Sequence, residues 1–320
     1  MKICLIGPGY MNIPPNGWGA VESLIWDYYQ NLVKKNINVE IINNKNLNEV
    51  ILYINKNNFD VVHIMYDDHI TIAPHIKNIK KILYTSHFAY ITHPNFEQKY
   101  NHYYNNIFKH VINNKNNIII FALSEQVKQK YIDYGFPSDK IIINHNGARN
   151  DMFNYTDSPC NIDKSIYLAK IEMRKKQYKY QDIKNIDFVG NYHDSPFNCK
   201  NDNYLGEWTK TTLYNKLSSY NNLILLSDGE ADPLVVKEAL ICGLGVIVSE
   251  CSSANLDLDK PFIDVIPNDK LDDIEYIQTI IEKNKEVCKK ERSNIREYGV
   301  SKFDWENIIN NYINLIENIN

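Results

Sequence analysis

The chain has 320 residues, 44% of them hydrophobic and 23% charged, and a formal net charge of -4. This length exceeds one ordinary hydrophobic core and suits two domains of roughly 150 residues each. The composition is that of a soluble globular protein and excludes a disordered chain. The small negative charge gives no reason to expect a nucleic acid as partner.

The N-terminus and the cysteines indicate where in the cell the protein is expected. Only four apolar residues, 3–6, precede Gly7-Pro8, so a secretory signal is not expected. No later segment approaches the roughly 20 apolar residues of a membrane span, and membrane association is not indicated. Six cysteines lie far apart without a C-x-x-C pair. This spacing favours free thiols in a reducing cytoplasm over a zinc site or a disulfide framework.

Short apolar runs alternate with helical segments along the first half of the chain. The predicted strands are 2–6, 39–43, 60–65, 81–86, 118–123 and 140–144. After the polar stretch NYTDSPCNIDK the pattern restarts, with predicted strands at 165–169, 186–190, 222–226, 244–249 and 262–266. Repeated strand–helix units indicate parallel sheets, so the predicted class is α/β.

Two helices are predicted at the end of the chain, over 271–290 and 303–319. The second carries an apolar stripe at helical spacing that should pack on another element, namely Trp305, Ile308, Ile309, Tyr312, Leu315 and Ile316. We expect an N-terminal domain over 1–155, a C-terminal domain over 156–302 and a final helix over 303–320. Ligands of such sheets bind at the carboxyl ends of the strands, so a cleft between two facing domains is the expected site.

The most informative segment is LILLSDGEADPLVVKEALICGLGVIVSE, residues 223–250. Asp232 suits the N-cap of a helix, Pro233 its first position and Gly243 its C-terminal stop. The predicted helix therefore runs from about Pro233 to Cys242. Glu230 precedes it in the loop, and Glu238 lies about 8 to 9 Å deeper along the helix. Two carboxylates at this separation can bracket a diphosphate held at the helix N-terminus.

This segment resembles the signature of the family 4 glycosyltransferases, which is Glu, seven residues, Glu, followed by A-L-x-x-G. The matching residues are Glu230 and Glu238, then 239–243. The resemblance implies a GT-B fold, with two Rossmann-like domains that face each other. It also implies that Glu238 holds the ribose of a nucleotide and that Glu230 contacts the donor sugar. Asp232, Leu234 and Val235, at the start of the helix, are expected to bind the same donor.

A basic segment, YLAKIEMRKKQ, follows the first strand of the second half. The resemblance places one cation at the end of this strand and another a few residues on, which assigns Lys170 and Lys175 to the diphosphate. Arg174 is a neighbouring donor-binding candidate. Cations beside a leaving diphosphate stabilise charge that develops as the glycosidic bond breaks. The alternative is a solvated basic surface at the start of a helix.

The loop after the first strand, IPPNGWGAVESL, contains Gly17 and Gly19. These glycines would let the backbone approach a phosphate or an acceptor closely, and family members carry a glycine-rich stretch here. A dinucleotide fingerprint at Gly7 and Gly9 is rejected. Position 12 is Asn, and the second strand ends in two asparagines without an acidic residue for a ribose.

His87 ends the fourth predicted strand and resembles the histidine that the family places beside the donor sugar. A lone histidine at this spacing is otherwise an ordinary core residue. The acidic groups at 67–69 and 228–232 lack convincing metal-ligand geometry, so neither a metal nor any other cofactor is expected.

The sequence therefore predicts a retaining, metal-independent glycosyltransferase. Its donor is a UDP- or GDP-type nucleotide sugar, and its acceptor is a glycan or another hydroxyl compound. Alternatives are a nucleotide-sugar epimerase or phosphorylase of the same architecture, or a non-catalytic protein that binds nucleotide sugars.

Overall fold

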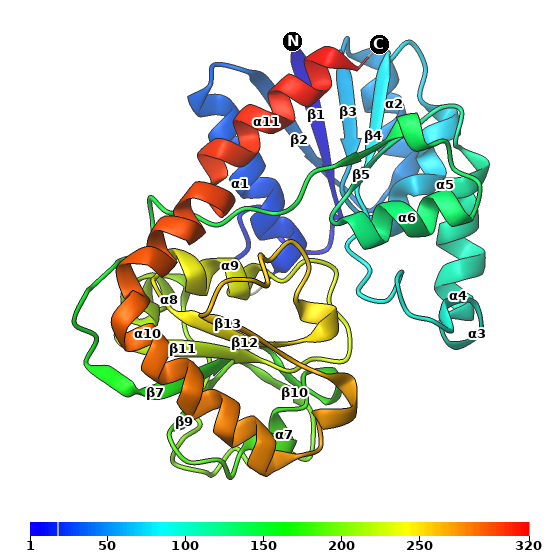
Figure 1. Cartoon of the computed structure of the whole chain (residues 1–320). Coiled ribbons are helices and arrows are strands. Elements are labelled where there is room, and N and C mark those ends of the chain that lie inside the picture. The colour runs from blue at the N-terminus through cyan, green and yellow to red at the C-terminus, as the bar shows by residue number, and fades with distance from the viewer. Residues whose placement is uncertain (18, 320) are drawn as a thin grey trace. The chain divides into compact units, whose positions relative to one another are not determined.

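A computed structural model of the chain describes residues 1–17 and 19–319. They form two compact units (Figure 1). Unit 1 comprises Met1–Asn146 and the chain from Ile308 onward, and unit 2 comprises Gly147–Asn307. Each unit is built on a parallel sheet, so the predicted α/β class is confirmed.

Unit 1 contains a six-stranded parallel sheet in the order β2-β1-β3-β4-β5-β6. Its strands are β1 (Lys2–Gly7), β2 (Asn38–Asn43), β3 (Val61–Ile64), β4 (Lys81–Tyr84), β5 (Ile119–Ala122) and β6 (Ile141–Ile143). Each coincides with a predicted apolar run to within two residues at either end. Short apolar runs flanked by polar residues therefore located this sheet correctly.

Helical segments connect the strands of unit 1. They are α1 (Ala20–Lys34), α2 (Leu47–Lys56), η1 (Asp67–His75), α3 (Phe96–Lys99), α4 (Asn101–Tyr103), η2 (Tyr104–Phe108), α5 (Lys109–Asn113), α6 (Glu125–Asp133) and η3 (Ser138–Lys140). Two of these helices begin at a side-chain cap. Asn46 accepts a hydrogen bond from the Glu49 amide, and Ser124 accepts one from the Val127 amide.

Side chains alternate between the two faces of the unit 1 sheet. Val62 and Ile64 of β3 pack into an apolar cluster with residues of α2, α5 and α6. His63, between them, points to the opposite face and lies 6.0 Å from the ring of Tyr28 in α1. Burial lowers the pKa of His63 to about 3, so its ring is neutral in the fold.

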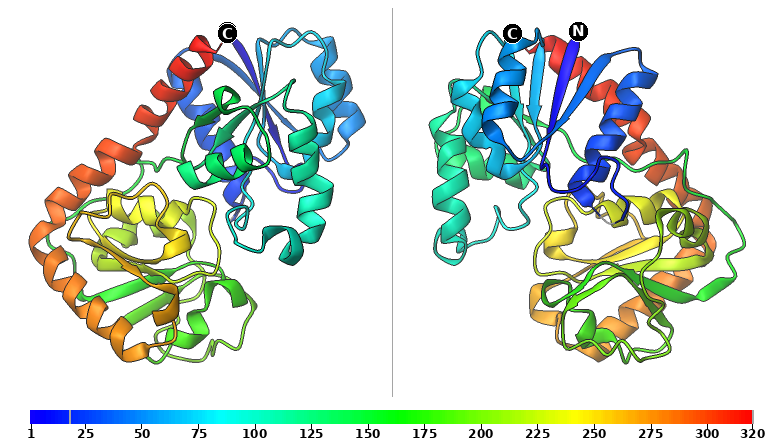
Figure 2. Two further views of the ribbon diagram at one scale, coloured as in Figure 1. Left: turned by 45° about the vertical axis from the view of Figure 1, so that its right-hand side comes forward. Right: turned by 180° about the vertical axis from the view of Figure 1, so that it is seen from behind.

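The last helix, α11 (Trp305–Asn318), covers the same face of this sheet as α1 (Figures 1 and 2). The ring of Tyr312 is stacked on His63, and its hydroxyl shares a 3.0 Å hydrogen bond with His63 Nδ1. Tyr312 also packs edge-on against Tyr28. The part of the predicted stripe in unit 1 is buried, except that Leu315 is half-buried, whereas the buried Trp305 belongs to unit 2.

Unit 2 contains a five-stranded parallel sheet in the order β13-β12-β11-β7-β9. Its strands are β7 (Asn161–Leu168), β9 (Ile186–Val189), β11 (Tyr220–Leu225), β12 (Gly245–Ser249) and β13 (Ile263–Ile266). All five were predicted. A separate two-stranded sheet of β8 (Ile171–Glu172) and β10 (Tyr192–Asp194) was not, because two or three residues are too few to show alternation.

The helical segments of unit 2 are η4 (Met173–Lys175), α7 (Gln177–Tyr180), α8 (Lys210–Lys216), η5 (Leu217–Ser219), α9 (Leu234–Ile241), η6 (Glu250–Ser252), η7 (Asn268–Lys270) and α10 (Ile274–Phe303). The prediction that the helix before α11 ends near Lys290 was wrong, because α10 continues to Phe303. Buried residues in this extension hold it against unit 2. Arg292 donates to the carbonyls of Thr156 and Tyr220, and Gly299 lets α10 approach the backbone of α9.

Candidate functional site

The candidate site lies at the carboxyl ends of β7 and β11, which are neighbours in the unit 2 sheet. The loop after β7 continues through β8 and η4, and the loop after β11 leads into α9. Because parallel neighbours end at the same edge of a sheet, residues about 55 positions apart in sequence meet there.

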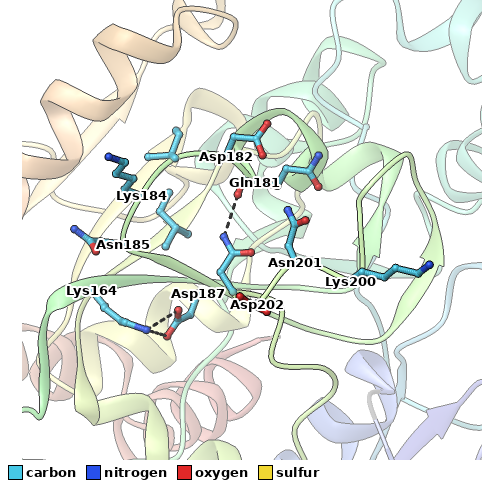
Figure 3. Close-up of a pocket in the computed structure, with 12 residues that line it drawn as sticks. Lys164, Gln181, Asp182, Lys184, Asn185, Asp187, Lys200, Asn201 and Asp202 are labelled. Carbon is cyan, nitrogen blue, oxygen red and sulfur yellow. Dashed lines mark hydrogen bonds and ion pairs between the residues drawn. The ribbon is translucent and has the colours of Figure 1, made fainter.

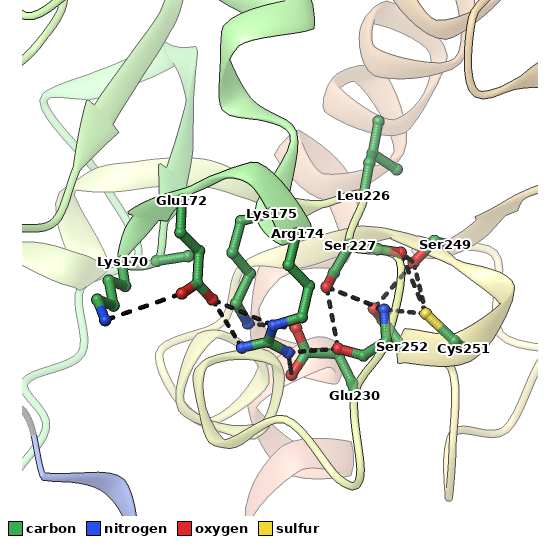
Figure 4. Close-up of polar contacts among 12 residues, drawn as sticks. Lys170, Glu172, Arg174, Lys175, Leu226, Ser227, Glu230, Ser249, Cys251 and Ser252 are labelled. Atoms are coloured by element: carbon green, nitrogen blue, oxygen red, sulfur yellow. Dashed lines mark hydrogen bonds and ion pairs between the residues drawn. The ribbon is translucent and has the colours of Figure 1, made fainter. Parts of the chain in front are cut away.

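Glu230 is the centre of an ion-pair cluster (Figure 4). Its Oε1 accepts a short hydrogen bond from Lys175 Nζ, and its Oε2 lies 3.6 Å from Arg174 NH1. The side chains of Lys175 and Glu230 are only 10% and 9% exposed, whereas Arg174 is 30% exposed. Three of the predicted site residues are therefore brought together, with two cations on one carboxylate.

Lys170 joins this cluster indirectly, through Glu172. Arg174 NH2 donates to Glu172 Oε1 over 2.8 Å, and Lys170 Nζ lies 3.8 Å from Glu172 Oε2. The side chain of Lys170 is 41% exposed. Glu172 was not predicted as part of the site, because one acidic residue in a basic segment gives no distinctive signal.

The backbone holds the two loops together. The Asp228 amide donates to the Arg174 carbonyl over 2.9 Å, and Arg174 donates through NH1 to the Gly229 carbonyl. Lys176 adopts a left-handed conformation, with φ of 55°, and its ammonium group pairs with Asp228. These contacts fix Lys175 and Glu230 from both sides.

Helix α9 begins directly after the Glu230 loop, as predicted, but Asp232 is not its N-cap. Pro233 occupies that position and provides no side-chain cap. Leu234 and Val235, both half-buried, form the first turn, and Glu238, also half-buried, is the fifth helical residue. Glu238 therefore lies about 6 Å along the helix axis from Leu234.

The sequence suggested that Asp232 caps the helix, but its carboxylate contacts other side chains. Its carboxylate accepts a short hydrogen bond from Lys237 and a 3.0 Å bond from Asn255. The side chain of Asp232 is 0% exposed and that of Lys237 is 1% exposed. A carboxylate that faces the protein interior in this way is engaged within unit 2. The predicted stop at Gly243, which has φ of +78°, is confirmed.

The remaining predicted residues belong to unit 1. His87 is half-buried in the loop after β4, and Gly17 precedes α1 with open space where a Cβ would be. Gly19 is the N-cap of α1, where a Cβ would lie 2.6 Å from a carboxylate oxygen of the buried Glu22. Close packing against Glu22 is thus sufficient to explain Gly19.

The two acidic groups that were considered as metal ligands lie in different units, 67–69 in unit 1 and 228–232 in unit 2. Within residues 1–17 and 19–319, no group of three or more His, Cys, Asp or Glu side chains is arranged to hold a metal ion. Asp67, one of the carboxylates considered above, accepts hydrogen bonds from the hydroxyls of Tyr84 and Tyr103.

A hollow of about 600 Å³ lies at the other edge of the unit 2 sheet, near the amino ends of β7 and β9 (Figure 3). Two of its charged groups are paired: Lys164 donates to both carboxylate oxygens of Asp187, each over 3.0 Å. None of the predicted site residues lines it. We therefore locate the chemistry at the carboxyl edge, where unlike charges converge on Glu230.

The arrangement at the carboxyl edge suits a phosphorylated ligand. Lys175 and Arg174 present positive charge, the start of α9 presents backbone amides, and Glu238 can accept hydrogen bonds from hydroxyl groups. Such a site can stabilise negative charge on a departing phosphate group.

Comparison with known proteins finds a family match over part of the chain. Residues 22–151 match the sequence model of Glycosyltransferase Family 4. This match covers 130 of the 320 residues. Together with the fold, it indicates a glycosyltransferase. No curated protein matches the chain in sequence.

Solved structures support the family fold over the full length of the chain. HepE of Anabaena, in complex with UDP and glucose, has a TM-score of 0.75 at 13% identity, with 100% of both chains covered. Sucrose-phosphate synthase from Thermosynechococcus elongatus has a TM-score of 0.72 at 15% identity, covering 99% of this chain and 98% of its own. The lipopolysaccharide outer core galactosyltransferase WaaB, in apo form, has a TM-score of 0.68 at 16% identity, covering 98% and 99%.

The chain thus has the GT-B-like fold that the resemblance implied. Its helices, over the part of the chain that the structure describes, include none long and apolar enough to cross a membrane. Sequence reasoning missed Glu172 and also Tyr167, whose hydroxyl donates to the Lys175 carbonyl and accepts from the Leu226 amide. Tyr167 lies in the strand segment SIYLA, where the hydroxyl of a buried tyrosine needs a partner.

Proposed function

We propose that the chain transfers a sugar from a nucleoside-diphosphate sugar to a hydroxyl acceptor, with retention of configuration and without a metal. The observation that carries this proposal is the contact of Lys175 and Arg174 with Glu230 at the carboxyl ends of β7 and β11. In this assignment unit 2 binds the donor and unit 1 supplies the acceptor side. We also propose that the protein works in the cytoplasm, as expected from the sequence.

The donor is assigned by the chemistry along α9. Glu238 accepts hydrogen bonds from the ribose hydroxyls, and the first-turn amides of Leu234 and Val235 face the diphosphate. HepE was solved with UDP and with UDP-glucose, which makes a UDP-sugar the first donor to test. GDP-sugars are the second class.

Lys175 and Glu230 have linked roles in this proposal. The diphosphate competes with Glu230 for the ammonium group of Lys175, because both ligands are anionic and Lys175 is buried enough to favour a close counter-charge. The released Glu230 then accepts a hydrogen bond from the donor sugar. Lys175 and Arg174 stabilise the diphosphate as it leaves, with Lys170 as a more distant cation.

The transfer step needs no separate base. The bond between the anomeric carbon and the phosphate oxygen breaks, and the acceptor oxygen bonds to the anomeric carbon on the same face. The acceptor proton passes to the leaving phosphate oxygen. His87, Gly17 and Gly19 are assigned to the sugar and acceptor side of this reaction by resemblance. The protein supplies orientation and charge stabilisation.

The test is a screen of UDP- and GDP-sugars against a panel of glycans and simple glycosides. We expect nucleotide release that rises with acceptor, and NMR of the product should show the anomeric configuration of the donor. Activity should persist in excess chelator. Donor isomerisation without acceptor would instead indicate an epimerase, and binding without release would indicate a non-catalytic protein. Activity that is lost on chelation and restored by Mg²⁺ or Mn²⁺ would contradict the metal-independent mechanism.

A further inference from the structure

Tyr167 lies on β7 directly beneath the two loops that carry the ion-pair cluster. It is 0% exposed, and its hydroxyl contacts both loops. We infer that Tyr167 is a positioning residue for the proposed transfer, which holds Lys175 and Glu230 at the separation that the reaction requires. This inference rests on the proposed function.

The hydroxyl of Tyr167 makes two hydrogen bonds, one as a donor and one as an acceptor. It donates to the Lys175 carbonyl over 2.5 Å, and it accepts from the Leu226 amide over 2.8 Å. Leu226 is the first residue after β11 and begins the loop that leads to Glu230. The Tyr167 hydroxyl therefore connects the backbone of Lys175 to the start of the loop that carries Glu230.

Burial and packing fix the protonation state of the Tyr167 hydroxyl and the position of its ring. Burial raises the pKa of Tyr167 well above its usual value, so the hydroxyl keeps the proton that it donates to Lys175. The ring lies parallel to Phe188 of β9, at 5.7 Å, and to Tyr180 of α7, at 6.3 Å. The ring cannot swing away from the loops without disturbing both neighbours.

A second buried hydroxyl holds the Glu230 loop from the side of β12. Ser249, 0% exposed, donates to the Ser227 carbonyl over 2.7 Å, and the Ser227 hydroxyl donates to the Gly229 carbonyl (Figure 4). Tyr167 and Ser249 are thus both buried side chains that hold this loop. Tyr167 differs from Ser249 because it also contacts the loop that carries Lys175.

The experiment compares two tyrosine variants. Tyr167→Phe removes the hydroxyl and leaves the ring to pack as before. Tyr180→Phe is the matched control: Tyr180 is also 0% exposed, and its hydroxyl donates to the Leu271 carbonyl over 2.9 Å, away from the cluster. For each variant we would measure the Tm, the Kd for UDP by calorimetry, and kcat and KM for UDP-glucose or the donor that the screen selects.

We expect Tyr167→Phe to lower kcat roughly 10- to 100-fold, because small displacements of catalytic groups cost this much. The Kd for UDP should change less than about threefold, since the ribose contact lies on α9. The Leu226 amide should exchange hydrogen faster than in the wild type, because it loses its acceptor. Tyr180→Phe should leave kcat within about twofold at a similar loss of Tm.

Equal kcat values in the two tyrosine variants, or an unchanged kcat in Tyr167→Phe, would overturn the inference while leaving the proposed function intact. A wild-type chain that releases no nucleotide from any UDP- or GDP-sugar would overturn the proposed function itself. If Tyr167→Phe melts below the assay temperature, Ser249→Ala replaces it. Loss of kcat at constant Kd for UDP supports positioning of the Glu230 loop, and an unchanged kcat contradicts it.

Discussion

Unit 2 contains two lysine–carboxylate ion pairs whose carboxylates, Glu230 and Asp232, are two residues apart and whose exposure to solvent differs. Lys175 and Glu230 connect two loops at the strand ends and are 10% and 9% exposed. Lys237 and Asp232 connect the start of α9 to its own preceding loop and are 1% and 0% exposed. Both contacts join a lysine to a carboxylate, and the access to solvent differs.

This difference separates a binding group from a structural one. Burial lowers the pKa of Lys237, with the charge of Asp232 opposing the shift, so Lys237 depends on its partner to remain charged. Lys237 also lies 5.5 Å from the ring of Phe303 at the end of α10. The side chain of Lys175 is 10% exposed, and the proposed function assigns it to an anionic ligand. On that proposal, partial exposure, and not charge alone, distinguishes the donor-binding pair from the structural pair.

The largest effect is expected from breaking the buried pair. Lys237→Ala leaves the carboxylate of Asp232 buried without its cation, and the free energy of unfolding should fall by about 3 to 5 kcal/mol. Denaturant titration followed by circular dichroism measures this loss. The double variant Lys237→Met with Asp232→Leu should recover much of it, because both buried charges are then removed. A single variant as stable as the wild type would show that the pair is not structural.

Lys175→Ala tests the other side of the comparison. It removes a cation from the leaving diphosphate, so turnover should fall about 100- to 1,000-fold, as for loss of one group that stabilises charge in the transition state. Its Tm should fall far less than that of Lys237→Ala. Initial rates with the selected donor, together with thermal melts, measure both. If turnover is retained while the Tm drops, Lys175 is structural like Lys237.

The two glutamates of the family signature should separate in their effects. Glu238→Ala removes hydrogen bonds to a charged group, worth roughly 1.5 to 3 kcal/mol, so UDP should bind about 10- to 150-fold more weakly. Glu230→Ala should leave UDP affinity nearly intact and lower kcat with the intact donor. Calorimetry with UDP and kinetics with the donor provide the two measurements. Equal weakening of UDP binding by both variants would contradict these assignments.

The smallest effect is expected from Lys170. Its side chain is 41% exposed, and it reaches the cluster only through Glu172, so Lys170→Ala should lower turnover about two- to fivefold. The effect should shrink further at high salt, which screens exposed charges. Rates at two ionic strengths check this. A loss as large as that of Lys175→Ala would place Lys170 directly on the diphosphate.

Much of the fold was predictable because its strands are apolar runs between polar segments, and both main sheets followed from that pattern. The extent of α10 was not. The polar run 289–294 reads as the end of a helix, yet Arg292 and Gly299 within the extension are buried by contacts that only the folded chain reveals.

The candidate site shows the same division. The positions of Glu230 and Lys175 followed from the family motif, and the structure brings them into contact. The burial of Asp232 did not follow, because the residue has the type and place of a good N-cap. Lys237 was the available signal: a lysine among apolar residues in LVVKEALI needs a buried partner, and Asp232 is five residues before it.

The chain order of unit 1 has a consequence for synthesis. Tyr312 of α11 stacks on His63 and packs against Tyr28, yet it follows all of unit 2 in the sequence. A ribosome therefore releases the six-stranded sheet long before the helix that covers one of its faces, and unit 2 can complete its core first. Until then that face is a nascent apolar surface, for which chaperones are natural partners.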